Sequence, residues 1–140
     1  MTWRIGEILI QKKLINWDQL QEALSEQKMT KEYTGAILVR KGFVSDLLLY
    51  KALAEQYQVR FVDLARIKIN PKAVEKLPKS IAEKYGIMPI ELHDDILTLG
   101  SANPIRTWPE SEIKELAGVR EIRAVLCVPA EIDKAIRENY

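Results

Sequence analysis

Apolar residues recur at intervals of three and four along the first part of the chain, which is the spacing of one face of an α-helix. Asn16 is a favourable N-cap, and Gln19 three residues later completes a variant of the capping box. A helix is therefore predicted to begin after Asn16. One stripe of this helix should pack against another element, and it contains Trp17, Leu20, Leu24 and Gln27.

The helical pattern occurs twice. Residues 4–27, RIGEILIQKKLINWDQLQEALSEQ, align without a gap with residues 33–56, YTGAILVRKGFVSDLLLYKALAEQ, at an offset of 29. Each copy predicts a short helix, a tight turn and a longer helix. One copy cannot bury its own apolar face, so the two should pack together as a four-helix unit. Nine of the 24 aligned pairs are identical: Gly6/Gly35, Ile8/Ile37, Leu9/Leu38, Lys12/Lys41, Leu20/Leu49, Ala23/Ala52, Leu24/Leu53, Glu26/Glu55 and Gln27/Gln56.

Glycines stand at two kinds of position in these repeats. Gly6 and Gly35 lie near the start of a predicted helix, where the missing side chain lets a backbone or a ligand come close. Gly42 lies at the end of the first helix of the second copy and predicts a left-handed cap. The first copy has Lys13 there, which would be strained in that conformation, so its turn is expected to close differently.

After Tyr57 the pattern changes to short β-rich runs that alternate with helical ones. The sequence thus predicts an α+β fold, with a helical tandem-repeat domain over residues 1–57 and a small α/β unit with a mainly antiparallel sheet over residues 58–140. The elements expected in the second domain are an extended segment at 59–63, helices at 70–77 and 80–84, a hairpin of strands 87–92 and 96–99, a helix at 109–116, a strand at 122–128 and a last helix from 129.

Charge and composition narrow the class of protein. Lys and Arg number 21 and Asp and Glu 20, in scattered positions, so the clustered positive field that DNA or RNA binding needs is missing. No uncharged stretch approaches the roughly 18 residues of a membrane span, and charged residues interrupt the N-terminal segment where a signal peptide would be apolar. We therefore expect a cytoplasmic protein without direct membrane insertion.

Few residues are suited to catalysis or metal binding. The phosphate-binding pattern G-x-x-x-x-G-K-[ST] is missing, so ATP turnover is the weakest hypothesis for this chain. One histidine and one cysteine are too few for a structural zinc site. Cys127 lies in an apolar run and is predicted to be a buried thiol, and His93 beside Asp94 and Asp95 is predicted to be a solvated hairpin tip. We expect no catalytic residues, no metal ligands and no enzymatic activity.

Arg4 is the most informative charge. It precedes Gly6 at a predicted helix start, where a guanidinium next to free amides suits an anion or a guanine, although an ordinary surface arginine explains it as well. Gln27 and Gln56 close the two repeats in equivalent places. Two similar half-sites would suit a ligand that is itself nearly two-fold symmetric.

The two copies resemble the tandem motif RLGxxLVxxGxIxxxxLxxxLxxQ of MshEN, the N-terminal domain of type II secretion and type IV pilus assembly ATPases. The run 61–64, the Asn103–Pro104 pair and the closing helix from Pro129 resemble the α/β part of that domain, so the resemblance covers nearly the whole chain. It implies that the partners are an ATPase body or its hexamer, in cis or in trans, and the cytoplasmic part of an inner-membrane platform protein. Through that protein the domain would sit peripherally at the inner membrane.

In the family the motif pair binds cyclic di-GMP, and the resemblance carries this ligand to matching positions. The second copy departs from the motif at Tyr33, where arginine is expected, and at Thr34, where leucine is expected; Lys13 replaces a motif glycine in the first copy. The ligand-binding residues implied by the resemblance are Arg4, Ile5, Gly6, Leu9, Leu20, Leu24 and Gln27 in the first copy and Tyr33, Gly35, Leu38, Leu49, Leu53 and Gln56 in the second.

Two functions remain open at this point. The first is a non-catalytic regulatory and docking domain of a type II secretion or type IV pilus assembly ATPase system, with cyclic di-GMP as the candidate ligand. The alternative is a protein–protein interaction domain whose nucleotide motif has degenerated and no longer binds. The departures at Tyr33, Thr34 and Lys13 favour the alternative.

Overall fold

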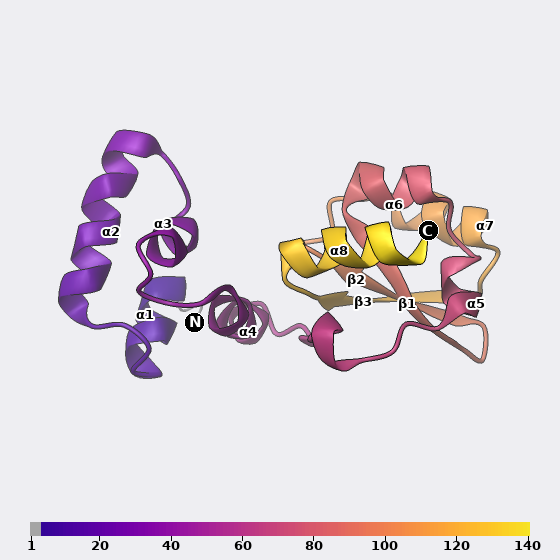
Figure 1. Cartoon of the computed structure of the whole chain (residues 1–140), viewed down its shortest axis with the longest axis horizontal. Helices are drawn as coiled ribbons and strands as arrows, with labels where there is room; N and C mark the ends of the chain where they lie inside the picture. Colours follow the sequence, from indigo (N-terminus) through magenta and orange to yellow (C-terminus); the bar gives the residue numbers. More distant parts are fainter. Residues whose placement is uncertain (1–3) are drawn as a thin grey trace. The chain divides into compact units, whose positions relative to one another are not determined.

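The computed structural model describes residues 4–140. The chain divides into two compact units, Met1–Gln58 and Val59–Tyr140, each with a hydrophobic core of its own. The first unit is helical, whereas the second combines helices with a three-stranded sheet (Figure 1). The α+β fold class predicted from the sequence is confirmed.

The first unit consists of α1 (Ile5–Gln11), α2 (Trp17–Thr30), α3 (Thr34–Arg40) and α4 (Asp46–Gln56). Side-chain caps fix where the two longer helices begin. The Asn16 side chain accepts a hydrogen bond from the Gln19 amide at 2.8 Å, and the Gln19 side chain accepts one from the Asn16 amide at 2.9 Å. Ser45 caps α4 by accepting from the Leu48 amide. The predicted capping box is therefore confirmed.

The turns that end α1 and α3 are the same in both repeats. The amide of Leu14 donates to the carbonyl of Leu9 at 2.9 Å, and the amide of Phe43 donates to the carbonyl of Leu38 at 2.9 Å. The left-handed residue of this turn is Gly42 at φ 78° in one copy and Lys13 at φ 61° in the other. The expectation that Lys13 closes the turn differently is wrong, because the backbone bonds hold the same turn against the preference of lysine.

Replacing Lys13 by glycine is expected to stabilise the first unit. A non-glycine residue in the left-handed conformation costs about 1–2 kcal/mol, which glycine avoids. Glycine in turn destabilises the folded state by about 0.5–1 kcal/mol, because it makes the unfolded chain more flexible. The free energy of unfolding should therefore rise by about 0.5–1 kcal/mol in urea denaturation, while Gly42→Ala should lower it by a similar amount. Equal stability of all three proteins would contradict this account of the turn.

The four helices pack crosswise between repeats: α1 packs against α4, α2 against α3, and α1 against α3. Their core is centred on Leu9, Ile37 and Leu38, which are fully buried. The predicted stripe of α2 is wrong at Trp17, which is 63% exposed. The 14 residues of α2 extend about 21 Å, whereas the seven residues of α3, the helix packed against it, extend about 10 Å, so α3 alone cannot cover the whole length of α2.

The second unit is built on the sheet order β1 (Ile87–His93), β2 (Ile96–Ser101) and β3 (Glu121–Leu126). β1 and β2 form the predicted antiparallel hairpin, whereas β2 and β3 are parallel. The parallel pair requires a crossover, which α7 (Glu110–Ala117) provides. Phe61 forms an isolated parallel bridge with Leu126, the last residue of β3, so the extended segment expected at 59–63 touches the sheet.

The outer edge of β1 explains the short helix beside it. The pairing of β1 shifts at Ile90, whose carbonyl accepts from the Asn70 amide at 2.9 Å, and Pro89 is tolerated because β1 is an edge strand. Asn70 also caps α5 (Pro71–Val74). The helix expected over residues 70–77 is thus shorter than predicted, since the next proline, Pro78, restarts the chain as the cap of α6 (Lys79–Tyr85).

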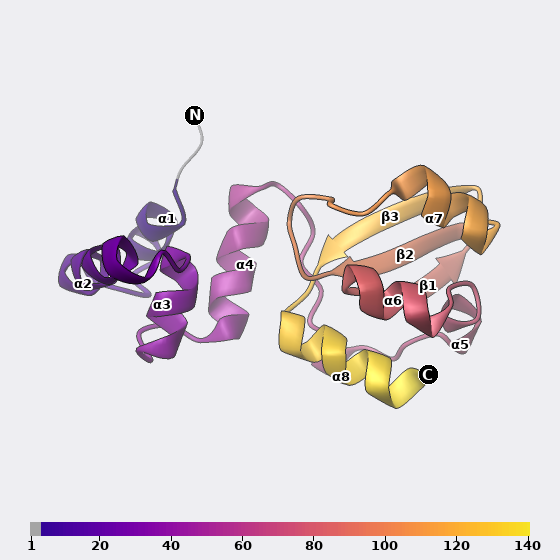
Figure 2. The ribbon, with the colours of Figure 1, turned by 90° about the horizontal axis from the view of Figure 1, so that it is seen from above.

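Helices α6 and α8 (Pro129–Asn139) lie together over the sheet (Figure 2). A 3-10 turn, η1 (Leu64–Arg66), packs against α8 and was not anticipated from the sequence. The Tyr140 hydroxyl donates to the Leu77 carbonyl at 2.8 Å and ties the end of the chain to the loop before α6. The core of this unit is aliphatic apart from Trp108, and its fully buried members include Ile87, Met88, Leu97 and Leu99.

Candidate functional site

The two repeats place equivalent residues in equivalent positions. Arg4 and Tyr33 are the N-caps of α1 and α3, with φ and ψ of −73° and 151° for Arg4 and −66° and 142° for Tyr33. The backbone carbonyls of Arg4 and Tyr33 each accept a hydrogen bond at 3.2 Å from the amide four residues later in the chain. Neither side chain caps its helix. Arg4 is exposed, and Tyr33 is 86% exposed. Both side chains are thus available to a partner in water.

Gly6 and Gly35 each lie close to a leucine of the same repeat. A Cβ added at Gly6 would lie 2.6 Å from Leu20 Cδ1, and one added at Gly35 would lie 3.0 Å from Leu49 Cδ1. Both leucines are buried, so neither moves aside without disturbing the core. The close approach expected at these glycines is therefore made by a leucine of the following helix.

The two glycines should respond differently to alanine. Overpacking costs about 1–3 kcal/mol, and replacing a helical glycine by alanine gains about 1 kcal/mol in helix propensity. Gly6→Ala should therefore lower the free energy of unfolding by about 1–2 kcal/mol, while Gly35→Ala, with its longer contact, should be nearly neutral. Urea denaturation followed by circular dichroism measures both, and equal losses would contradict this interpretation.

The apolar motif residues lie in the interior. Leu9, Leu20, Leu38 and Leu49 are buried in the core of the first unit, and Ile5, Leu24 and Leu53 are half-buried against it. Their side chains hold the four helices together, whereas the polar motif residues Arg4, Gln27, Tyr33 and Gln56 keep part of their surface accessible. The motif residues therefore fall into two groups: apolar residues that form the framework, and four polar side chains that could contact a ligand.

Gln56 carries an unusual atom. Its side-chain oxygen Oε1 is buried and has no hydrogen-bond partner among the residues that the structure describes. Leaving a buried acceptor without a donor costs about 1–3 kcal/mol. Gln27, the equivalent residue at the end of α2, is half-buried. The indole Nε1 of Trp108, in the second unit, is likewise buried without a partner among the described residues.

Ion pairs join the repeats crosswise. Lys12 of the first copy lies 2.6 Å from Glu55 of the second, and Lys41 of the second lies 3.2 Å from Glu26 of the first. These are equivalent pairs, because 12 and 41, like 26 and 55, are 29 positions apart. In the sequence, these four residues stand out only as identities between the two copies. A lysine and a glutamate that are both repeated are the sequence signal of such a reciprocal contact.

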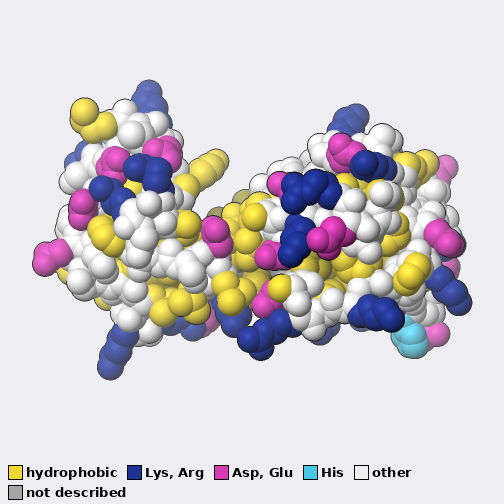
Figure 3. Space-filling model, in the orientation of Figure 1, with side chains coloured by type: hydrophobic (Ala, Val, Ile, Leu, Met, Phe, Trp, Pro, Cys, Tyr) yellow, Lys and Arg dark blue, Asp and Glu magenta, His cyan; other side chains and the backbone are white. Residues whose placement is uncertain are grey.

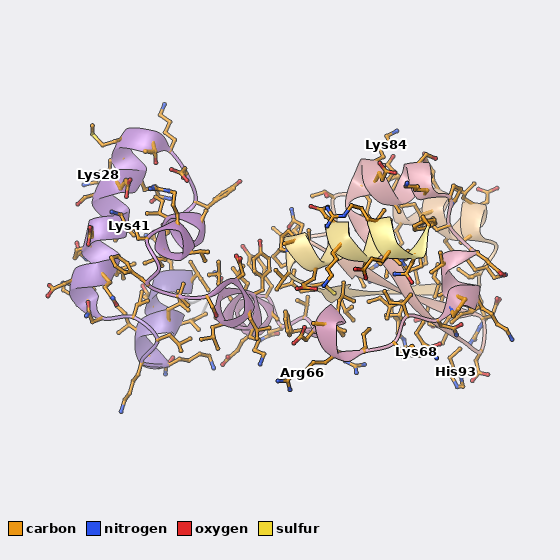
Figure 4. The ribbon with its side chains drawn as sticks, viewed as in Figure 1. Lys28, Lys41, Arg66, Lys68, Lys84 and His93 are labelled. Carbon is orange, nitrogen blue, oxygen red and sulfur yellow. The ribbon has the colours of Figure 1, made fainter. Side chains whose placement is uncertain are left out.

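The seam between α2 and α3 carries additional charges. Arg40 contacts Glu26 at 2.8 Å and Glu32 at 3.2 Å, and Lys41 also contacts Glu22. Hydrogen bonding by Arg40, followed by that of Lys41, lowers the pKa of Glu26, and bonding to Glu22 and then Glu26 raises the pKa of Lys41. Figure 3 shows basic and acidic side chains interleaved on this seam, and Figure 4 shows Lys41 between the two helices.

The other residues considered from the sequence have structural explanations. Cys127 is fully buried as predicted, and burial raises the pKa of its thiol to about 12, so it remains protonated and unreactive at neutral pH. His93 and Asp94 form an exposed contact at the hairpin tip. Within residues 4–140 no three His, Cys, Asp or Glu side chains gather as metal ligands would, and no helix is long and apolar enough to cross a membrane.

Residues 57–140 match the model of the MshEN domain family. This chain is a member of the MshEN family. The match lies on the α/β unit, whereas the motif resemblance seen in the sequence lies on the repeats, so the two observations support the assignment independently.

Comparisons over the whole chain extend this assignment. The chain is 33% identical over 138 residues to a type IV pilus assembly ATPase PilB of Thermus thermophilus and 29% identical over 140 residues to the PilB of Myxococcus xanthus. It covers 98% and 100% of its own length in these matches, but spans only 15% and 25% of the two relatives. The MshEN domain described here thus corresponds to a minor part of each pilus ATPase.

Solved structures share the fold. A structure of MshE with cdg superposes with a TM-score of 0.79 at 24% identity, covering 99% of each chain. The N-terminal domain of XpsE superposes with a TM-score of 0.67 at 22% identity, covering 98% of this chain and 94% of that one. At these identities the comparison establishes the fold, which includes both the tandem repeat and the α/β unit.

Proposed function

We propose that this MshEN domain is a non-catalytic regulatory and docking domain of a type IV pilus assembly or type II secretion ATPase system, and that its tandem motif binds cyclic di-GMP. Its relatives are pilus ATPases that are several times longer, and MshE, which shares its fold, was solved with cdg. The catalytic part then lies outside this domain, in the ATPase body that it joins in cis or meets in trans.

The observation that carries the proposal is the unpartnered oxygen of Gln56. A glutamine carbonyl oxygen accepts hydrogen bonds, and the edge of guanine offers N–H donors. The Gln56 residue as a whole is half-buried, so a turn of its side chain would bring this oxygen to the surface, where a guanine N–H would satisfy it.

The symmetry of the unit supports the same ligand. Cyclic di-GMP is two-fold symmetric, and the two repeats present equivalent residues and make reciprocal contacts with each other. The guanidinium of Arg4 supplies a charge-assisted contact at one end. At the other end Tyr33 supplies an exposed aromatic ring, which stacks on a base without a charge.

Isothermal titration of the purified chain with cyclic di-GMP tests the proposal, with GTP and cyclic di-AMP as controls. We expect saturable binding of cyclic di-GMP, weaker binding of cyclic di-AMP because the ring edge of adenine differs in its donors, and no saturable binding of GTP. A titration without heat, together with an unchanged melting temperature at high ligand concentration, would reject cyclic di-GMP as the ligand.

Restoring the motif arginine should strengthen binding. Tyr33→Arg adds a charge-assisted contact at the N-cap of α3, in the position that Arg4 occupies on α1. A hydrogen bond to a charged group contributes about 1.5–3 kcal/mol, part of which is offset by losing the tyrosine ring, so we expect the Kd for cyclic di-GMP to fall about tenfold. Met29→Arg, at another exposed apolar side chain of the unit, is the matched control and should leave the Kd unchanged.

A second function is favoured by the packing of the glycines. Because Leu20 and Leu49 pack closely on Gly6 and Gly35, the motif is also consistent with a framework that has lost its ligand. The domain would then act by protein contact alone, with the cytoplasmic part of an inner-membrane platform protein as its partner. Capture of that partner by wild type and by Arg4→Ala alike, with no effect of dinucleotide, would support this function over the first.

A further inference from the structure

The contacts that hold the first unit together run between the repeats in a reciprocal way. α1 of the first copy packs on α4 of the second, and α2 of the first packs on α3 of the second. The ion pairs Lys12–Glu55 and Lys41–Glu26 are related in the same way, since each joins a lysine of one copy to a glutamate of the other. Each repeat thus offers one interface, and its partner offers an equivalent one, as in an isologous dimer.

The segment between the repeats is short and strained. Only residues 31–33 separate α2 from α3, and Lys31 takes the left-handed conformation at φ 61°, which is unfavourable for lysine. Residues 28–34 contain neither glycine nor proline, so no helix breaker separates α2 from α3. A continuous helix would give up the hydrogen bond from the Glu32 amide to the Thr30 hydroxyl and the Arg40–Glu32 ion pair. Straightening would return Lys31 to right-handed backbone. A short hinge under strain is the condition that favours exchange of elements between chains.

We propose that the inner face of each repeat is a docking surface for the complementary repeat of a second copy of this chain, reached when residues 31–33 straighten. In the exchanged dimer every contact between repeats is kept, but its two sides come from different chains. Each pair of motifs is then completed by two chains, so that Arg4 comes from one copy and Tyr33 from the other. The exchange itself does not depend on cyclic di-GMP being the ligand.

The protein concentration decides whether the monomer or the exchanged dimer is populated. A flexible linker of a few residues holds its two ends at an effective concentration in the millimolar range, so the closed monomer should dominate at micromolar concentration. Deleting Lys31 and Glu32 leaves one residue between the helices, which is too few for α3 to fold back on α2. We expect this deletion variant to be a dimer by light scattering at micromolar concentration, with the helix content of wild type. Inserting Gly-Ser-Gly after Lys31 should keep the monomer.

Charge reversal gives a test that leaves the hinge intact. Glu26→Lys places the new ammonium against Lys41, and Lys41→Glu places the new carboxylate against Glu26, so each closed monomer has like charges at the seam. In an exchanged heterodimer of the two variants, one seam is native. The other carries the reversed pair, with Arg40 still facing position 26 and Glu22 still facing position 41. After joint refolding at millimolar concentration, native mass spectrometry should show the heterodimer in at least several-fold excess over either homodimer.

Two results would overturn the proposal. One is a deletion variant that is monomeric and unfolds like wild type. The other, which remains decisive if the deletion variant fails to fold, is a mixture of charge variants that gives only monomers, or dimers in statistical proportion. Exchange at the repeats is also distinguished from simple association by dilution, because an exchanged dimer separates only as fast as the first unit unfolds.

Discussion

Leu38→Ala is expected to lower the free energy of unfolding of the first unit by about 3–5 kcal/mol, because Leu38 is fully buried and stands where α3 meets the rest of the core. Truncating a buried leucine removes its transfer free energy and leaves a cavity that the four short helices fill only in part. Since small domains are stable by about 5–15 kcal/mol, this loss leaves the unit close to unfolding.

The second unit should not share this loss, since its core is a separate cluster of residues. Hydrogen exchange measured by mass spectrometry distinguishes the two: peptides from residues 5–56 should exchange much faster in Leu38→Ala, and peptides from residues 87–139 should be unchanged. Leu48→Ala, at a leucine that is 39% exposed in the same unit, is the control and should have little effect. Faster exchange throughout the chain would show that the two units unfold together.

Arg4→Ala is expected to raise the Kd for cyclic di-GMP ten- to a hundredfold, and to abolish the thermal shift that the ligand produces. A hydrogen bond between a charged group and its partner contributes about 1.5–3 kcal/mol, which corresponds to this range of affinity. Because Arg4 is exposed and its side chain caps no helix, the variant should fold with the melting temperature of wild type when no ligand is present.

The comparison with a second exposed arginine makes this result specific. Arg123→Ala removes the same charge from the α/β unit, on the exposed side of β3, and should leave the affinity unchanged. Equal losses in the two variants would mean that long-range charge, and not a contact at the motif, attracts the dinucleotide. An unchanged Kd in Arg4→Ala would remove the arginine from the site and favour the protein-interaction function.

Local chemistry in the sequence was sufficient to predict most elements. Asn16 and Ser45 begin the long helices, Gly86 and Gly118 end α6 and α7, and proline opens α8, since each acts through backbone atoms within a few residues of itself. The tandem repeat, the α+β class and the hairpin around Asp94 were also readable, because hydrophobic spacing and turn preference are properties of short segments.

Long-range contacts decided what the sequence left open or indicated wrongly. Trp17 fits the spacing of the buried stripe but is 63% exposed, because periodicity does not say how far along a helix its neighbours reach. The motif resemblance named Gln56, but not that its side-chain oxygen is buried without a partner, since this depends on which atoms surround it in three dimensions.

The sequence by itself determined the repeat, its helices and the resemblance to the family. The helices depend on neighbours three or four positions apart, and the repeat and the motif can be aligned without knowing the fold. Only the tertiary structure decided that the repeats pair crosswise, that β3 joins β2 in parallel, and that Gly6 makes room for Leu20. Such contacts join residues that are distant in the chain. Hydrophobic periodicity indicates that one face of a helix is buried, but it does not indicate which element covers that face.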